Sequence, residues 1–109
     1  MSRSIIIQSV WKNWLVGTID SLEFEAKVCD VASEYGADNG RVIKLVIYNA
    51  NPDRELVVYD RGWELYPDPI YENMLDDLLN YCAGLPKAED WRLSEGNITN
   101  AKGDLDHDH

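Results

Sequence analysis

One stretch of this sequence combines an aromatic ring, glycines and an arginine, as binding loops do. Residues 33–36 are Ser-Glu-Tyr-Gly, and residues 40–41 are Gly-Arg. Tyrosine offers a stacking face, glycine lets another backbone approach, and a guanidinium fits a carboxylate or a phosphate. We predict a clamp for a ligand or partner that uses Glu34, Tyr35 and Arg41. The alternative is an ordered connection in which Glu34 and Arg41 pair with each other.

A second stretch of the same kind covers residues 59–63, Tyr-Asp-Arg-Gly-Trp. Asp60 and Arg61 are adjacent and lie between two aromatic residues, Tyr59 and Trp63. This composition is typical of surfaces that recognise peptides or bases, so we predict binding residues here too. The alternative is a turn that leaves a strand, with Trp63 packed beneath a helix.

A third group of residues is acidic. Glu72, Asp76 and Asp77 lie on one face of a predicted helix, and Glu64 and Asp68 precede them. Such a face can imitate the phosphate row of a nucleic acid or meet a basic patch. A solvated helix surface is the simpler interpretation.

Sequence patterns of common enzymes are missing. Both histidines, His107 and His109, are at the C-terminal end, and there is no phosphate loop, nucleophile elbow or zinc-ligand spacing. Cys29 and Cys82 have no metal-site spacing and are expected to be free thiols. We therefore predict a non-enzymatic protein without cofactor or metal. A small enzyme that uses Asp60 or Glu34 is the alternative.

The overall charge narrows the class of partner. The chain has 109 residues and a formal net charge of −10, which disfavours direct binding to nucleic acid or to an anionic membrane. A basic partner protein remains compatible with this charge. No apolar run is long enough to span a bilayer, and residues 1–8 do not form a signal peptide, so we expect a cytoplasmic protein.

The hydrophobic pattern predicts four strands. Residues 5–19 form the first segment, and residues 22–29 alternate apolar and polar side chains with a period of two. Residues 41–48 and 55–59 supply two more strands. In a four-stranded meander, the loop at 31–40 and the exit of the strand at 55–59 open at the same end of the sheet. The two candidate binding stretches would then share one site.

One amphipathic helix follows the strands. Asp68 suits the N-cap and Pro69 the first helical position, and Gly84 is placed to end the helix. The inward positions form a helical stripe of Tyr71, Leu75, Leu78 and Cys82. The predicted fold is α+β, a four-stranded antiparallel sheet in ββββα order with the helix on one face. Residues 1–84 form a single domain, and 85–109 an extension that is mobile after about residue 95.

Two tryptophans stand three residues apart in the first segment. In one continuous strand, Trp11 and Trp14 would lie on opposite faces. One would then be in the core and the other exposed, which suggests an interface. Self-association and a foreign partner are equally open, so a homo-oligomer is one expectation.

About half of the chain, from Trp14 to Trp63, resembles a family of short uncharacterised domains associated with phages and prophages. The matching runs are Trp-Leu-Val-Gly-Thr-Ile at 14–19, Phe-Glu-Ala-Lys-Val at 24–28, Ser-Glu-Tyr-Gly at 33–36, Gly-Arg-Val-Ile-Lys-Leu at 40–45 and Tyr-Asp-Arg-Gly-Trp at 59–63. The resemblance implies a setting and no mechanism. Both ends depart from the family pattern, with an Ile-rich start that contains Trp11 and an extension from Leu85.

These observations favour a small non-enzymatic binding protein of a phage or mobile element. It would occupy a host protein or sequester a small ligand, for example to counter a host defence. Three alternatives stay open: an acidic nucleic-acid mimic that blocks an enzyme, a small enzyme, and a structural or assembly component.

Overall fold

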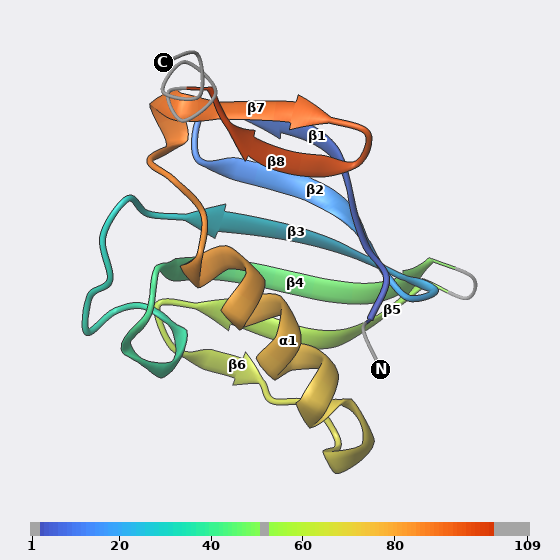
Figure 1. The fold of residues 1–109 in the computed structure, drawn as a ribbon. Coiled ribbons are helices and arrows are strands. Elements are labelled where there is room, and N and C mark those ends of the chain that lie inside the picture. Colours follow the sequence, from blue (N-terminus) through green and yellow to red (C-terminus); the bar gives the residue numbers. More distant parts are fainter. Residues whose placement is uncertain (1–2, 51–52, 102–109) are drawn as a thin grey trace.

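The computed structural model describes residues 3–50 and 53–101. The α+β class is confirmed, but the predicted four-stranded sheet is wrong. The main sheet has six antiparallel strands in the order β1-β2-β3-β4-β5-β6, each beside its neighbour in sequence (Figure 1). The strands are β1 (Ile5–Trp11), β2 (Trp14–Ile19), β3 (Leu22–Val28), β4 (Val42–Ala50), β5 (Asp53–Asp60) and β6 (Trp63–Leu65).

Tight turns account for both additional strands. The first segment is divided at Lys12, whose φ of 54° lets the chain reverse, so that β1 and β2 form a hairpin with Trp11 opposite Trp14. Facing residues of an antiparallel pair share one side of the sheet. The expectation that the two tryptophans lie on opposite faces is therefore wrong. In the same way, Arg61 has a φ of 57° and turns the chain from β5 into β6.

The C-terminal part of the described chain is also more ordered than predicted. Strands β7 (Trp91–Ser94) and β8 (Asn97–Asn100) form a separate two-stranded sheet. Residues 97–100 of the expected mobile tail form strand β8, whereas residues 102–109 lie outside the described part. The turn residues Glu95 and Gly96 both have positive φ, which favours a tight hairpin. The division of the chain at residue 84 stays a prediction.

The helix follows the predicted stripe. A 3₁₀ turn, Pro69–Tyr71, leads into α1 (Glu72–Ala83), and Gly84 follows its last turn. Met74, Leu75, Leu78 and Cys82 are buried. The Asp68 side chain makes no capping hydrogen bond. No helix in the described ranges has the length and apolar character to cross a membrane.

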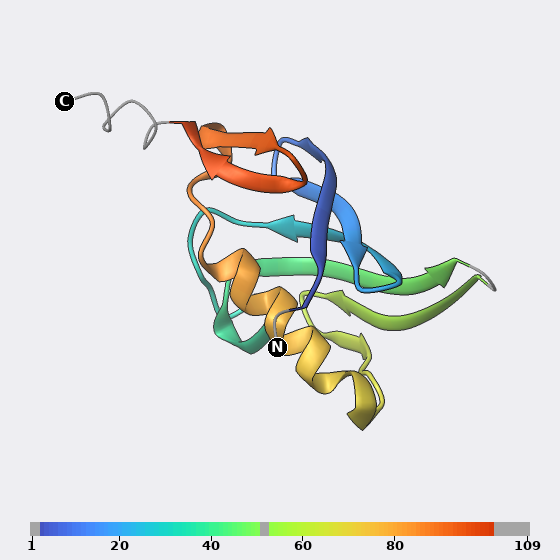
Figure 2. The ribbon, with the colours of Figure 1, turned by 45° about the vertical axis from the view of Figure 1, so that its right-hand side comes forward.

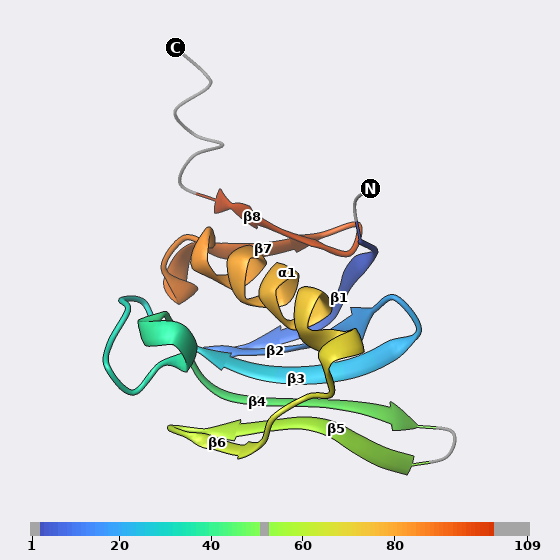
Figure 3. The same ribbon diagram turned by 90° about the horizontal axis from the view of Figure 1, so that it is seen from below.

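Helix α1 and the β7–β8 hairpin lie on the same side of the sheet (Figure 3). We call this side the inner face and the opposite side the outer face. The hairpin packs beside β1, where the Ile7 amide donates a hydrogen bond to the Gly96 carbonyl (N···O 2.7 Å). The turned view in Figure 2 shows β1 passing the turn of this hairpin at a steep angle to its two strands. The described elements therefore cover only the inner face.

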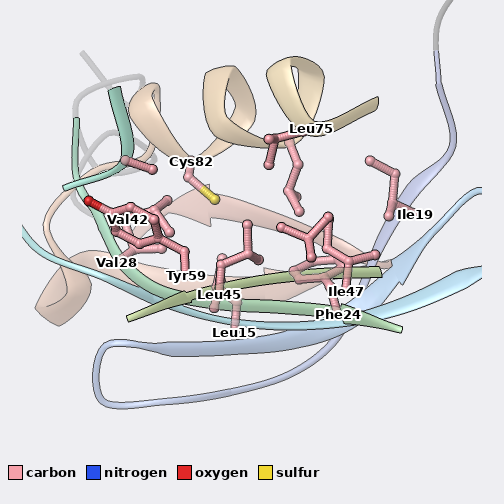
Figure 4. Packing of buried hydrophobic residues seen from close by; sticks show 14 of the residues in the cluster. Leu15, Ile19, Phe24, Val28, Val42, Leu45, Ile47, Tyr59, Leu75 and Cys82 are labelled. Atoms are coloured by element: carbon pink, nitrogen blue, oxygen red, sulfur yellow. The ribbon is translucent and has the colours of Figure 1, made fainter. Parts of the chain in front are cut away.

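The core lies between the sheet and α1 (Figure 4). Leu75 and Cys82 project from the helix toward Phe24, Leu45 and Ile47 of the sheet. A register shift between Lys27 and Val28 alters the alternation where β4 begins. The buried β-sheet residues are Ile7, Leu15, Ile19, Leu22, Phe24, Ala26, Val28, Val42, Leu45, Ile47, Val57 and Tyr59.

Candidate functional site

Arg41 connects the sheet to the end of the helix. Its Nε donates to the Cys29 carbonyl (2.8 Å), Nη1 to the carbonyls of Ala83 and Leu85, and Nη2 to that of Pro86 (3.0 Å). Four of the five guanidinium N–H donors are therefore bonded within the chain. Arg41 therefore has a structural role, because its guanidinium holds backbone carbonyls of the same chain. Among the described residues, Arg41 forms no ion pair with Glu34.

The loop that precedes Arg41 is also held by its own backbone. Ser33 donates its amide to the Gly40 carbonyl (3.0 Å), and Gly36 donates to the Ser33 carbonyl (3.1 Å). A Cβ atom added at Gly36 would overlap the carbonyl oxygen of Gly40, so the glycine is required by this close approach. Glu34 and the Tyr35 side chain are exposed on the outside of the loop.

The two candidate binding stretches do meet at one end of the sheet. The buried Tyr59 donates its hydroxyl to the Tyr35 carbonyl (2.8 Å), which ties the loop to β5. Burial is the main reason why the pKa of Tyr59 is raised, and the nearby Asp38 carboxylate adds to the effect. Tyr59 thus positions the loop from the inner face.

The side chains beyond Tyr59 are more accessible. Trp63 packs edge-on against Tyr59 (ring centroids 4.8 Å apart) and against Tyr66 (4.9 Å). Trp63 is 37% exposed and Tyr66 53%. Arg61 donates its backbone amide to the Ile43 carbonyl (2.9 Å), while its side chain is 66% exposed and lies 3.4 Å from an Asp60 oxygen. This contact is a surface ion pair of little energetic weight.

Strand β6 forms an edge of the main sheet. It pairs with β5 on one side, and in the described ranges no strand pairs with its other side. All three of its residues are exposed. We define the β6 edge by four exposed apolar or aromatic side chains, namely Trp63, Leu65, Tyr66 and Ile70.

The sequence analysis found only Trp63 of these four. Leu65, Tyr66 and Ile70 lie in the segment between β5 and α1, which contains Pro67 and Pro69. Connections between elements are normally polar, so large apolar residues in this proline-containing one were an available signal of an exposed apolar surface.

Carboxylates surround the β6 edge. Tyr66 donates its hydroxyl to a Glu72 oxygen (2.8 Å), and this bond is the main reason why the Tyr66 pKa is raised. Glu64 lies on β6 itself, and Asp68 lies in the following connection. The edge therefore presents aromatic surface within a negative local field.

The predicted acidic face of α1 is partly engaged by other groups of the chain. Arg3 bridges Asp77 (Nε···Oδ2 2.7 Å) and Asp20 (Nη1···Oδ2 2.9 Å), and this pairing raises the Arg3 pKa. Glu72 accepts the Tyr66 hydroxyl, whereas Asp76 is exposed beside the loop that contains Asp38. Two of the three predicted carboxylates thus have partners within the chain.

The two tryptophans near the N-terminus lie on the outer face of the sheet. Trp11 is 67% exposed and has the Lys12 ammonium 4.7 Å from its ring centroid. Trp14 is half-buried and lines a shallow hollow of about 200 Å³ on the outer face, together with Lys44 and Asp60. The outer-face hollow shares Tyr59 and Asp60 with the candidate binding stretches.

A larger hollow lies away from both stretches. It has a volume of about 590 Å³ and is lined by Val10, Lys12, Asn13, Asp30, Lys87, Ala88, Glu89 and Trp91. None of the predicted binding residues lines it. Within residues 3–50 and 53–101, no group of three or more His, Cys, Asp or Glu residues could hold a metal ion. Cys29 and Cys82 are both free thiols.

The comparison with protein families identifies the class of this chain. Residues 13–83, from the start of β2 to the end of α1, match a family described as a domain of unknown function, DUF7678. Because the match covers more than half of the sequence, the chain belongs to this family. Strand β1 and the β7–β8 hairpin lie outside the matched residues. No curated protein and no solved structure matched the chain.

Proposed function

We propose that this chain is a non-catalytic binding domain that holds an extended, basic segment of a partner protein against the β6 edge. The observation that supports this most strongly is the aromatic group of Trp63 and Tyr66 beside an unpaired sheet edge. An edge strand offers backbone N–H and C=O groups to an added strand. Exposed aromatic side chains next to it supply the contact area on which binding energy usually depends.

The local charge supports the choice of a basic partner. Glu64, Asp68 and Glu72 lie along the edge, and the whole chain has a net charge of −10. Complementary charge speeds encounter and disfavours acidic competitors. Lysine or arginine side chains that alternate with apolar ones would place charges near these carboxylates and apolar groups on Trp63.

Binding of a protein segment has more support than binding of a small ligand. The hollow of about 590 Å³ has the volume of a ligand pocket, but it lies away from the motif residues. The proposed setting, a phage or mobile element, rests on the sequence resemblance alone. That the product occupies a host protein in the cytoplasm and counters a defence is part of the same proposal. Membership of the family leaves this setting as a proposal.

A short peptide of alternating lysine and valine, with blocked termini, tests the proposal. We expect it to bind, and we expect Trp63→Ala to weaken binding by about 2 kcal/mol, roughly thirtyfold, because a central aromatic contact is lost. Isothermal titration calorimetry measures both affinities. Trp11→Ala removes an exposed tryptophan at the opposite edge and is the matched control.

Two further peptides separate strand addition from plain charge attraction. Replacing the central valine by proline removes a backbone donor, so this peptide should bind more weakly despite the same charge. An alternating glutamate and valine peptide should not bind. Equal binding of the proline peptide, or equal loss in Trp11→Ala and Trp63→Ala, would refute docking at the β6 edge.

A further inference from the structure

The hollow of about 590 Å³ is built mostly by residues outside the family match. It lies where the β1–β2 turn, the end of β3 and the connection from α1 to β7 meet. Six of its eight lining residues come before residue 13 or after residue 83. The parts of the chain outside the match therefore add a cavity of the size that small ligands occupy.

Hydrogen bonds within the chain fix the walls of this hollow. The Asn13 side-chain nitrogen donates to the Val28 carbonyl (2.8 Å), and the Val28 amide donates to the Asn13 carbonyl (2.8 Å). These two bonds hold the β1–β2 turn beside β3. The Ala88 amide donates to an Asp30 oxygen (2.9 Å), which holds the connection from α1 beside the end of β3. The hollow is therefore preformed, as ligand sites usually are.

Exposed charged groups of both signs line the hollow, and they do not neutralise one another. Lys12 and Lys87 supply ammonium groups, and Asp30 and Glu89 supply carboxylates. Within the described residues, no ion pair joins any two of these four side chains. The Lys12 ammonium instead lies 4.7 Å from the centre of the Trp11 ring. The hollow thus offers separate positive and negative groups to a ligand.

An apolar wall accompanies these charges. Val10, Ala88 and Trp91 line the same hollow. The Trp91 indole nitrogen Nε1 donates to the Pro86 carbonyl (2.8 Å), so the ring has a fixed orientation and keeps no donor for a ligand. Trp91 therefore contributes apolar contact area, to which the large surface of an aromatic side chain is suited.

We propose that this hollow binds a short peptide whose two termini are both free. A zwitterion is complementary to a hollow lined by separate positive and negative groups. The α-carboxylate contacts Lys12 and Lys87, the α-ammonium contacts Asp30 and Glu89, and an apolar side chain packs on Trp91. A hollow of this volume holds a drug-sized molecule, so a peptide of about three residues fits it better than a single amino acid.

The charges make simpler ligands less suitable. The net charge of −10 and the two carboxylates of the hollow disfavour a plain anion such as phosphate. The two lysines disfavour a plain cation in the same way. A peptide with free termini satisfies both sets of groups and adds no net charge.

The tripeptide Ala-Phe-Ala tests this site by isothermal titration calorimetry. We expect saturable binding of the peptide with free termini. Acetylation of its N-terminus removes the ammonium, and amidation of its C-terminus removes the carboxylate. Each change should weaken binding by about tenfold, because a hydrogen bond to a charged group is lost. Equal affinities of the free and the blocked peptides would overturn the inference, as would the absence of binding.

A double lysine variant assigns the carboxylate end of the peptide. Lys12→Met with Lys87→Met should bind the free and the amidated peptide equally, while it still prefers the free N-terminus. A misfolded protein would lose both preferences. Lys27→Met with Lys44→Met removes the same charge from the outer face and is the matched control, in which both preferences should remain. A hollow variant that still prefers the free carboxylate would overturn the assignment.

The carboxylates of the hollow give the reverse test. Asp30→Asn with Glu89→Gln should bind the free and the acetylated peptide equally, while it still prefers the free C-terminus. An asparagine oxygen at position 30 still accepts the Ala88 amide, so the wall of the hollow is kept. An unchanged preference for the free N-terminus would contradict the proposed contacts of the ammonium.

The hollow and the β6 edge are tested separately. Trp63→Ala should bind Ala-Phe-Ala as the wild type does. The lysine–valine peptide, whose termini are blocked, should not compete with it. Free phenylalanine should bind much more weakly than the tripeptide, because it fills less of the hollow. Competition between the two peptides, or equal affinities of phenylalanine and the tripeptide, would overturn the proposed peptide site.

Discussion

The loop at residues 29–41 and the β5–β6 turn meet at one end of the sheet and contain similar residue types, but they use them differently. In the loop, Arg41 donates to four backbone carbonyls and the Tyr35 carbonyl accepts from Tyr59. At the turn, Arg61, Trp63 and Tyr66 keep large parts of their side chains in solvent. The presence of arginine, tyrosine and glycine in a short stretch therefore does not show whether they bind a partner. Their contacts in the folded chain show whether each has a structural role or stays available for binding.

The two arginines give the largest expected difference. Arg41→Ala leaves four carbonyl groups without their donor, so we expect a loss of roughly 2–4 kcal/mol in the free energy of unfolding. Arg61→Ala removes an exposed side chain and should change it by less than about 0.5 kcal/mol. Urea denaturation measures both values. Arg41→Lys should recover only part of the loss, because an ammonium lacks the planar fork. Equal stability of Arg41→Ala and Arg61→Ala would contradict the structural role of Arg41.

The two glycines give a smaller contrast. An alanine at Gly36 would overlap the Gly40 carbonyl, whereas at Gly62 nothing lies within 4 Å of an added Cβ. We expect Gly36→Ala to cost about 1–3 kcal/mol, as overpacking does, and Gly62→Ala to be nearly neutral. Thermal melts of the pair measure this difference. A Gly36→Ala protein as stable as the wild type would mean that the loop opens without cost.

Much of the core could be predicted from the sequence, because its signals are local. The alternation in residues 22–28 predicts β3, and the apolar stripe between Pro69 and Gly84 predicts α1. Strand β6 could not be found in this way, because its three residues are held by pairing with Val58 and Tyr59 rather than by their own pattern. Strands β7 and β8 are also short, although the Glu95-Gly96 pair between them was a usable turn signal.

The site was harder to predict, because its key partners are distant in sequence. Three of the four Arg41 acceptors are backbone carbonyls more than 40 residues away, and a carbonyl has no sequence signature. The convergence of the loop with the exit of β5 was expected from strand direction, and the Tyr59–Tyr35 bond shows that these segments meet.

The helix end held by Arg41 also has a characteristic alkaline response. Burial raises the pKa of the Cys82 thiol from 9.0 to about 12, although the nearby Arg41 lowers it slightly. As the pH rises, the thiol loses its proton in the unfolded chain before it does so in the folded one. The free energy of unfolding therefore keeps its full Cys82 contribution below pH 9 and loses it as the pH rises toward 12. Denaturation between pH 8 and 11 should show a shallower decline for Cys82→Ala than for the wild type. Parallel stability curves for the two proteins would contradict this role of Cys82, since buried tyrosines contribute equally to both.

At the binding surface we expect a modest effect on stability. Trp63 is partly exposed, so Trp63→Ala should lower the free energy of unfolding by about 1 kcal/mol, less than Arg41→Ala, while it abolishes most peptide binding. Chemical denaturation and calorimetry on the same samples measure both quantities. Similar losses of stability for Trp63→Ala and Arg41→Ala would assign the β6 edge a structural role like that of the loop.

The most direct test is to follow backbone amide shifts by NMR during titration with the lysine–valine peptide. If β6 accepts an added strand, the amides of residues 63–66 should shift most, with smaller changes at Tyr59 and in the first turn of α1. The amides at 33–41 should change little, because that loop is bonded within the chain. Shifts spread over all acidic surfaces, or concentrated in the 33–41 loop, would contradict docking at the β6 edge.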